Sequence, residues 1–181
     1  MSTAGTPSSQ GSPFWRFSLR FYRQPQVADA CIALQEAAGV DVNLLLFLLW
    51  HAAGRRAFST AEVEGLERRV GPWRNTTVVP LRALRRALKT PPALVEAGAA
   101  EAFRTRIKAV ELEAERLQQQ TMYDLAAALN FAPASSALEA ARANVAAYGA
   151  ICPQDFPPAA VETILAAFAK ISAKTGREQP V

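Results

Sequence analysis

The stretch GVDVNLLLFLLWHAAGRR, residues 39–56, constrains the fold of this chain more than any other segment. Between Val42 and Ala53 only Asn43 and His51 are polar. A helix that crosses a membrane needs about 20 apolar residues. This run is shorter and is followed directly by two arginines, so we do not expect a membrane span. A helix that is apolar on nearly every face has to be enclosed by other helices. We therefore predict a helical bundle with residues 42–53 at its centre.

Capping signals mark the ends of several predicted helices. Gly39 ends one helix at a position that favours a residue tolerant of positive φ. Asp41 then caps the central helix through its carboxylate. Ser59 and Glu62 have the spacing of a capping box, and the same pattern recurs at Ser136.

Prolines divide the middle of the chain. We expect the helix after Ser59 to end at Gly71-Pro72 and the next helix to begin near Pro80, because proline disrupts a helix interior. After Pro91-Pro92 the longest helical pattern continues to Asn130. Its apolar residues step by four and three, which predicts packing along another helix. This stripe consists of Phe103, Ile107, Val110, Ala114, Leu117 and Thr121.

Together these patterns predict an all-α protein. Half of the residues are hydrophobic, helical spacing recurs, and no convincing strand pattern is present. We expect a bundle of about six or seven helices around the buried helix at 42–53. Four segments are expected: a disordered N-terminal tail (1–12), a helical bundle domain (13–131), a C-terminal annex of two helices packed on the bundle (132–174) and a disordered tail (175–181).

The N-terminal segment and the cysteines bear on the location of the protein. MSTAGTPSSQGSP is rich in Ser, Gly and Pro and lacks the apolar core of a signal peptide. Cys31 and Cys152 are far apart on helical segments, so we interpret them as reduced, buried side chains. With no predicted transmembrane segment, the expected location is the cytoplasm. A transit peptide extending to Arg23 is the alternative.

Three blocks of the sequence resemble a known family. The blocks are FSLRFYRQPQVADACIALQEAAGVDVNLLLFLLW, GPWRNTTVVPLRALRRALK and KAVELEAERL. In this order they are similar to a proteobacterial family of small helical proteins of unknown function. The likeness spans residues 14–129, and the segment after Pro133 looks like an extension present in only part of that family. The resemblance implies a helical fold and a bacterial cytosolic setting, and it transfers no catalytic residue.

Basic residues concentrate in one region of the chain. From residue 54 to residue 90, nine Lys or Arg stand against three Glu, a local balance of +6 within a formal net charge of +4. Four of these basic residues share one face of the helix expected near Pro80, with Trp73 close in sequence. The predicted partner-binding residues are Arg74, Arg82, Arg85, Arg86 and Lys89.

Three interpretations of this basic face are open. In the simplest, the arginines are solvated, or they pair with Glu111 and Glu115 inside the protein or across a homodimer. In the second, they bind the acidic surface of a partner protein. In the third they bind nucleic acid, although no recognised nucleic-acid motif is present.

A ligand pocket is the alternative kind of site. His51 is the only histidine, and it could line a pocket with Asn43, Trp50 and Trp73, since aromatic walls with a few polar groups suit small ligands. A histidine that only fills the core explains the same position. If Asn43 is buried, its amide needs partners, because an unpaired buried amide costs about 1–3 kcal/mol.

Catalytic and metal chemistry have little support in the sequence. Glu111 and Glu115 have the spacing for a metal site, but such sites in bundles also use Glu-x-x-His pairs, and the chain has one histidine. No nucleophile motif accompanies His51, and nothing local activates Cys31. We predict no catalytic residue, no metal and no cofactor. The leading hypothesis is a non-catalytic cytosolic protein-interaction or adaptor module. The alternatives are a small-molecule-binding protein or enzyme with the pocket above, and a nucleic-acid-binding protein.

Overall fold

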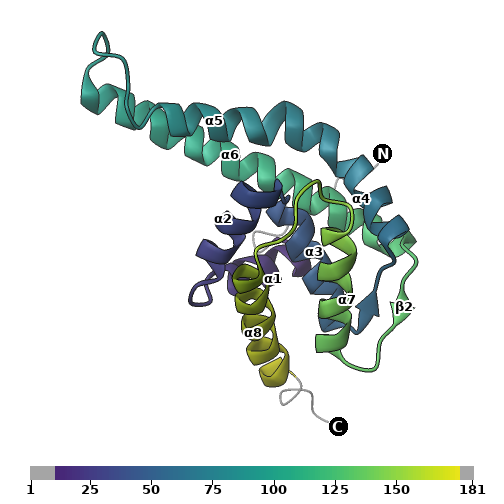
Figure 1. Cartoon of the computed structure of the whole chain (residues 1–181). Helices are drawn as coiled ribbons and strands as arrows, with labels where there is room; N and C mark the ends of the chain where they lie inside the picture. Colours follow the sequence, from purple (N-terminus) through teal and green to yellow (C-terminus); the bar gives the residue numbers. More distant parts are fainter. Residues whose placement is uncertain (1–10, 176–181) are drawn as a thin grey trace, which may run out of the picture.

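The structure is a computed structural model that describes the backbone of residues 11–175 and the side chains of residues 11–172. Most of the described residues are helical and only two very short strands occur among them, which confirms the predicted all-α fold. Most of the two predicted tails, residues 1–10 and 176–181, lies outside the described residues. Figure 1 shows a helical body from which a pair of helices projects.

Within the described residues the chain forms α-helices α1 to α8, a π-helical turn (η1), a 3-10 turn (η2) and two very short strands. The elements run in the order α1 (Pro13–Tyr22), α2 (Val27–Ala38), α3 (Val42–Ala53), β1 (Arg56–Ala57), α4 (Thr60–Trp73), η1 (Arg74–Val78), α5 (Val79–Ala87), α6 (Ala97–Leu125), η2 (Ala126–Ala128), β2 (Ala132–Pro133), α7 (Ala137–Gly149) and α8 (Pro158–Thr175).

The predicted helix caps are present. The carboxylate of Asp41 accepts hydrogen bonds from two backbone N–H groups in the first turn of α3. Ser59 and Glu62 form the complete capping box of α4. The Ser136 side chain caps α7, but the Glu139 carboxylate accepts from the N–H of Ser135 rather than from that of Ser136, so the second predicted capping box is only half formed. α2 ends at Gly39, whose φ of 69° lies in the left-handed region that glycine adopts most readily.

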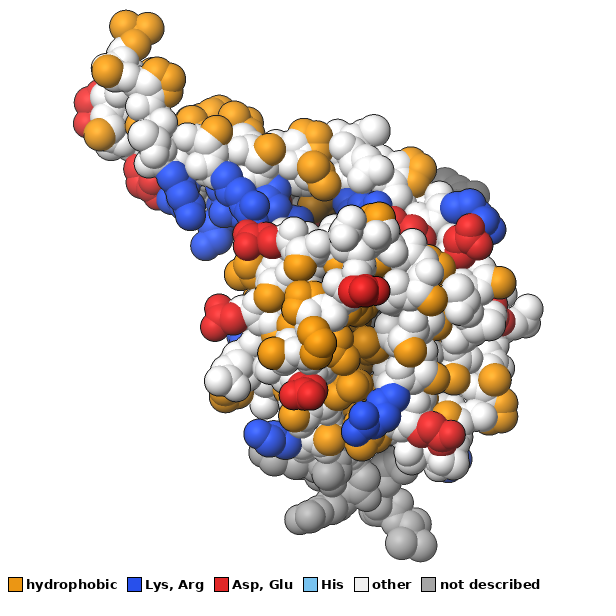
Figure 2. Space-filling view, in the orientation of Figure 1, with side chains coloured by type: hydrophobic (Ala, Val, Ile, Leu, Met, Phe, Trp, Pro, Cys, Tyr) orange, Lys and Arg blue, Asp and Glu red, His pale blue; other side chains and the backbone are white. Residues whose placement is uncertain are grey.

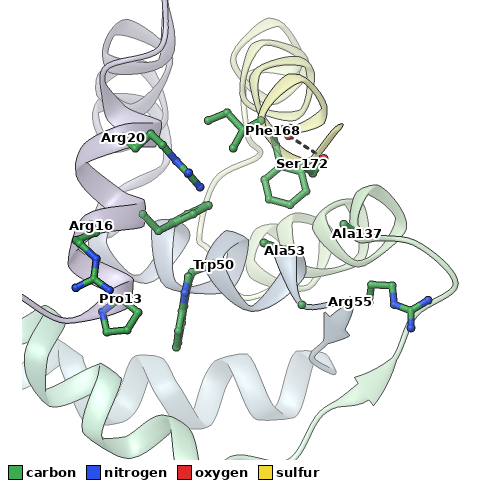
Figure 3. A pocket seen from close by; sticks show the side chains of 12 residues that line it. Pro13, Arg16, Arg20, Trp50, Ala53, Arg55, Ala137, Phe168 and Ser172 are labelled. Carbon is green, nitrogen blue, oxygen red and sulfur yellow. Dashed lines mark hydrogen bonds between the residues drawn. The ribbon is translucent and has the colours of Figure 1, made fainter. Parts of the chain in front are cut away.

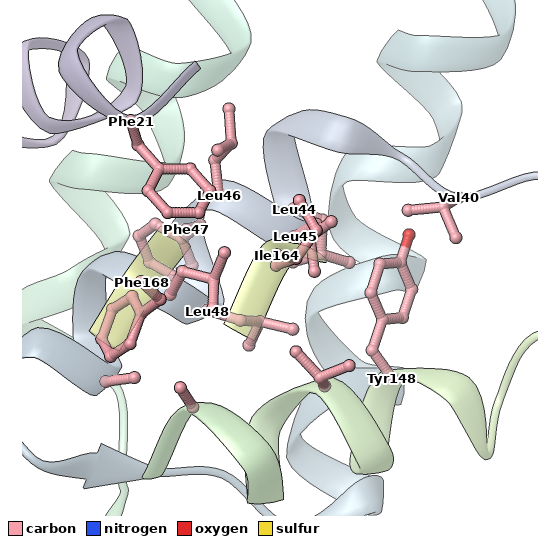
Figure 4. Close-up of a cluster of buried hydrophobic side chains, with 14 of the residues drawn as sticks. Phe21, Val40, Leu44, Leu45, Leu46, Phe47, Leu48, Tyr148, Ile164 and Phe168 are labelled. Carbon is pink, nitrogen blue, oxygen red and sulfur yellow. The ribbon is translucent and has the colours of Figure 1, made fainter. Parts of the chain in front are cut away.

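α3 is the centre of the hydrophobic core. Residues 44–49 are all at most 3% exposed, because α1, α4, α6 and α7 each pack against this helix. Figure 4 shows Phe21 of α1 and Phe168 of α8 gathered beside Phe47, while Tyr148 of α7 lies near Leu44. The predicted buried central helix is therefore confirmed.

The two C-terminal helices share this core. α7 packs against α3 and α4, and α8 packs against α2 and α7. The side chain of Asn144 in α7 is fully buried. Its oxygen accepts the Phe58 N–H at 2.8 Å, and its nitrogen donates to the carbonyls of Leu48 and Arg56 at 2.9 and 3.0 Å. The boundary predicted between residues 131 and 132 remains a prediction, and these contacts join α7 to the middle of α3 and to residues 56–58.

Two short strands close one side of the body. β1 and β2 pair antiparallel, with Arg56 opposite Pro133 and Ala57 opposite Ala132. Sequence patterns do not predict these strands, because two residues are too few for an alternating pattern.

α4, η1 and α5 form one continuous helix from Thr60 to Ala87. The expected break between Gly71-Pro72 and Pro80 is therefore wrong. A π turn is wider than an α turn and accommodates a proline ring, so the helix continues past Pro80, which lies just after η1. The hydroxyl of Thr76 donates to the Pro72 carbonyl at 2.8 Å within the same turn.

α5 and the first part of α6 form an arm that projects from the body (Figure 1). We define this arm as residues 79–117. Its two helices run antiparallel and pack against one another. α5 contains no buried residue, and α6 buries Ala100, Glu111 and Ala114 within the arm. A single pair of helices has no second layer to cover it, so apolar side chains of the arm remain partly exposed.

Candidate functional site

Much of the predicted basic face pairs with the protein's own side chains. Arg82 donates to three oxygens: Glu111 Oε1 at 3.0 Å, Glu115 Oε1 at 2.6 Å and Gln35 Oε1 at 2.6 Å. Arg85 binds both carboxylate oxygens of Glu111, one through Nε and the other through Nη2 at 3.2 Å. The Glu111 and Glu115 pairing considered from the sequence is therefore formed inside a single chain.

The remaining two residues of that face are more exposed. Arg86 Nη2 lies 3.5 Å from Glu36 of α2, and both side chains are about half exposed, so this pair contributes little stability. Lys89 is exposed and forms no ion pair with any residue that the structure describes. Figure 2 shows Lys and Arg side chains along the lower edge of the arm. Binding of an acidic partner by Arg86 and Lys89 stays a prediction.

The two glutamates of this network differ in their electrostatics. Burial opposes ionisation of Glu111, but hydrogen bonds from Arg85 and Arg82 outweigh that effect and lower its pKa. Burial raises the pKa of Glu115, although Arg82 acts in the opposite direction. Glu111 is therefore the carboxylate that holds its negative charge between the two arginines.

A buried polar cluster joins α3 to α6 and η1. The Asn43 side chain donates to Gln118 Oε1 at 3.1 Å and accepts from Gln119 Nε2 at 2.7 Å. Gln118 also donates to the Asp41 carboxylate at 2.6 Å, and Arg74 lies 3.5 Å from the same carboxylate. Burial raises the pKa of Asp41 despite these two partners. Asn43, from the predicted pocket, and Arg74, from the predicted partner surface, thus both belong to this internal cluster.

The structure does not bring the four predicted pocket residues together around one cavity. Trp73 is exposed near the base of the arm, where its Nε1 donates to the Ala114 carbonyl at 3.0 Å. Trp50 packs with its ring centroid 5.6 Å from those of Phe14 and Tyr123. Trp50 also lines a cavity of about 740 Å³, and Asn43, His51 and Trp73 are not among the residues that line it.

His51 lies inside a cage of aromatic rings. Its ring centroid is 4.5 Å from that of Phe47, 4.8 Å from that of Trp50 and 5.0 Å from that of Phe58. The side chain is 1% exposed, and neither ring nitrogen has a hydrogen-bond partner in the described part of the chain. Burial lowers its pKa to about 4. His51 is therefore a neutral ring packed into the core at pH 7.

Neither cysteine is activated as a nucleophile. Burial raises the pKa of Cys31 to about 12 and that of Cys152 to about 11, whereas reactive thiols have lowered pKa values. Among residues 11–172, no group of three His, Cys, Asp or Glu side chains is arranged to hold a metal ion. No helix in the described range combines the length and the hydropathy needed to cross a bilayer.

The arm carries a second surface, which is apolar. Leu84 of α5 and Phe103, Val110 and Leu117 of α6 are 42–52% exposed, and we call these four residues the apolar edge. Helical spacing directs them away from Arg82 and Glu115. Figure 2 shows hydrophobic side chains along the upper, α5 side of the arm, across from the Lys and Arg side chains. The sequence predicts that the α6 stripe packs along another helix, but α5 covers this stripe only in part.

The fold and these sites define a small helical protein with a projecting arm and with no activated thiol or metal cluster among its described residues. The family described as a protein of unknown function (DUF2390) matches residues 13–122, and the chain belongs to this family. The matched segment runs from α1 almost to the end of α6 and includes the whole arm. No curated protein and no solved structure matches the chain.

Proposed function

We propose that this protein is a non-catalytic interaction module that acts as a homodimer joined through the apolar edge of its arm. The observation that carries this proposal is the exposure of Phe103, Val110 and Leu117 on the side of α6 that α5 leaves uncovered. Two helices cannot enclose a core, whereas two such arms side by side form a four-helix bundle that can. A second copy of the chain therefore suits this surface.

The part of the apolar edge that lies on α6 is symmetric about Val110. Phe103 and Leu117 each lie seven residues from Val110, and residues seven apart return to nearly the same side of a helix. When two copies of α6 cross antiparallel at Val110, Phe103 of one copy meets Leu117 of the other. The two Val110 side chains then meet at the two-fold axis. Self-complementarity of this kind is what an interface between identical patches requires.

The charges beside the apolar edge support the same pairing. Arg106 lies four residues before Val110 and Glu113 three residues after it, and both are exposed. The guanidinium carbon of Arg106 lies 5.5 Å from the Phe103 ring centroid, and Glu113 pairs with Arg116 on the same helix. In an antiparallel pair centred on Val110, Arg106 of each copy lies within one residue of the position opposite Glu113 of the other. The interface thus repeats one pairing of opposite charges twice.

The opposite side of the arm supports a rigid docking element. Glu111 holds Arg82 and Arg85 of α5 through charged hydrogen bonds, and Glu115 holds Arg82 a second time. These bonds fix α5 against α6 without using the apolar edge. The two arginines therefore hold α5 against α6, and the apolar edge remains available to bind the second copy.

Sedimentation equilibrium of two matched variants tests the proposal. Val110 and Leu112 are both 52% exposed, but residues two apart on a helix point to different sides. We expect the wild type and Leu112→Glu to sediment as dimers and Val110→Glu to sediment as a monomer. Circular dichroism checks that both variants keep their helical content. A monomeric wild type, or equal masses for the two variants, contradicts the homodimer and leaves the apolar edge to a different partner.

A further inference from the structure

A cavity of about 740 Å³ opens on the body of the protein. Its walls come from α1, the C-terminal end of α3, the first residue of α7 and the last turns of α8. Figure 3 shows α1 on one side of this space and Phe168 and Ser172 of α8 on the other. Cavities of this size accept drug-sized ligands.

The walls of the cavity are largely apolar, and its charges have one sign. Phe17, Trp50 and Phe168 supply aromatic surface, with Pro13 and Ala53 beside them. The charged side chains that line it are Arg16, Arg20 and Arg55, with no Asp or Glu among them. A concave apolar surface with only positive charges attracts anions that also carry apolar surface.

Arg20 is the arginine best placed to hold a ligand. In Figure 3 its side chain extends from α1 toward the space between α1 and α8, while Arg55 lies at the far end near Ala137. No carboxylate in the described part of the chain lies within ion-pair distance of Arg20. Arg16, by contrast, already donates to the Gly11 carbonyl at 2.9 Å.

We propose that this cavity binds an amphipathic anion, a ligand with an apolar chain and one acidic head group. The chain lies against Phe17, Trp50 and Phe168, and the head group accepts hydrogen bonds from the guanidinium of Arg20. The planar fork of a guanidinium matches the two oxygens of a carboxylate. A neutral apolar ligand leaves the charge of Arg20 unpaired. A small inorganic anion leaves the aromatic side chains of the cavity uncovered. The site takes no residue from the arm, so it is independent of the proposed dimer.

Calorimetric titration with decanoate tests this proposal, with decanol as the neutral ligand of matched chain length. Arg20→Gln removes the proposed contact. Arg23→Gln removes the same charge from the C-terminal end of the same helix, at an exposed position outside the cavity. We expect saturable binding of decanoate, and binding at least about tenfold weaker for decanol and for Arg20→Gln, because charged hydrogen bonds are strong. Arg23→Gln is expected to bind like the wild type.

A second variant tests the cavity without touching its charges. Ala53 is exposed and lines the cavity, so Ala53→Trp fills the space with little effect on the core, and we expect it to abolish decanoate binding. Circular dichroism checks that each variant is folded. The proposal is overturned if the wild type shows no saturable binding, if decanol binds as tightly as decanoate, or if folded Arg20→Gln or Ala53→Trp binds decanoate like the wild type.

Discussion

Asn43 explains, at the scale of a single residue, why a polar side chain occurs within an otherwise apolar helix. Its amide is bonded to Gln118 and Gln119, which follow it by 75 and 76 residues. The sequence predicts that a buried Asn43 needs hydrogen-bond partners, because the residues beside it in the chain are apolar. The identity of the partners cannot, because it depends on how α6 crosses α3.

Replacing Asn43 with leucine is expected to destabilise the fold by about 2–3 kcal/mol, since the buried amides of Gln118 and Gln119 each lose a partner. Urea unfolding followed by circular dichroism measures the change. Gln120→Leu is the matched control, because among the described residues the Gln120 side chain bonds only to the exposed Asp124 of its own helix. A urea midpoint for Asn43→Leu equal to that of the wild type would contradict a stabilising role for the buried polar cluster.

His51 makes stability depend on pH with a defined sign. Its pKa is about 4 in the folded protein, against 6.5 for an unperturbed histidine. The unfolded chain therefore binds this proton more readily. The stability that depends on the neutral ring is complete above pH 6.5 and is lost as the pH falls toward 4. The loss reaches about 3 kcal/mol over that range.

We predict that His51→Phe removes this part of the pH dependence and is at least as stable as the wild type, because two unpaired ring nitrogens are replaced by carbon. The measurement is the free energy of unfolding of both proteins at several pH values from 4 to 7. The chain has no second histidine, so the difference between the two curves isolates this residue. Parallel curves would count against a neutral, desolvated His51.

At the scale of the element, helix caps are predictable because they are local. Asp41 and Ser59 act on backbone groups within three residues, so their sequence context is sufficient. The continuity of α4 and α5 is not predictable in this way. The rule that proline ends a helix assumes ideal α geometry, and the π turn before Pro80 departs from that geometry. The exposure of Val110 depends on what packs over α6, which periodicity does not reveal.

Glu111 and Glu113 offer a matched test of how the arm is held. Glu111 is buried between Arg82 and Arg85, whereas Glu113 forms an exposed pair with Arg116. We expect Glu111→Gln to lower the free energy of local opening of α5 by about 1–3 kcal/mol, because two arginines lose their charged partner. Glu113→Gln should change little. Hydrogen exchange of the α5 amides reports the difference, and equal exchange in the two variants contradicts the network.

At the scale of the whole molecule, the buried α3 allows the bundle to be predicted from one segment of sequence. The cavity is less accessible to such reasoning. Trp50 and His51 are adjacent in sequence, yet one lines the cavity and the other lies in the aromatic cage. The cavity is also lined by Arg20 of α1 and Phe168 of α8, two helices that are far apart in the sequence. Residues that meet only through tertiary packing leave no spacing pattern to find.

The homodimer makes a prediction about register that a general apolar surface does not. In the proposed homodimer, residue 110 would meet its own copy at the two-fold axis, whereas residue 103 would meet residue 117. In a background with Cys31→Ala and Cys152→Ala, Val110→Cys should therefore form a disulfide-linked dimer on mild oxidation. Phe103→Cys alone should not form such a dimer. A mixture of Phe103→Cys and Leu117→Cys should form a disulfide between the two variants.

The cross-linking yield of Val110→Cys, compared with that of Leu112→Cys on another side of the same helix, is the most direct measurement of the central claim. Both positions are 52% exposed, so their thiols are similarly accessible to the oxidant. The homodimer predicts nearly complete cross-linking at position 110 and little at position 112. Equal yields at the two positions, or no cross-link at position 110, contradict the proposed interface.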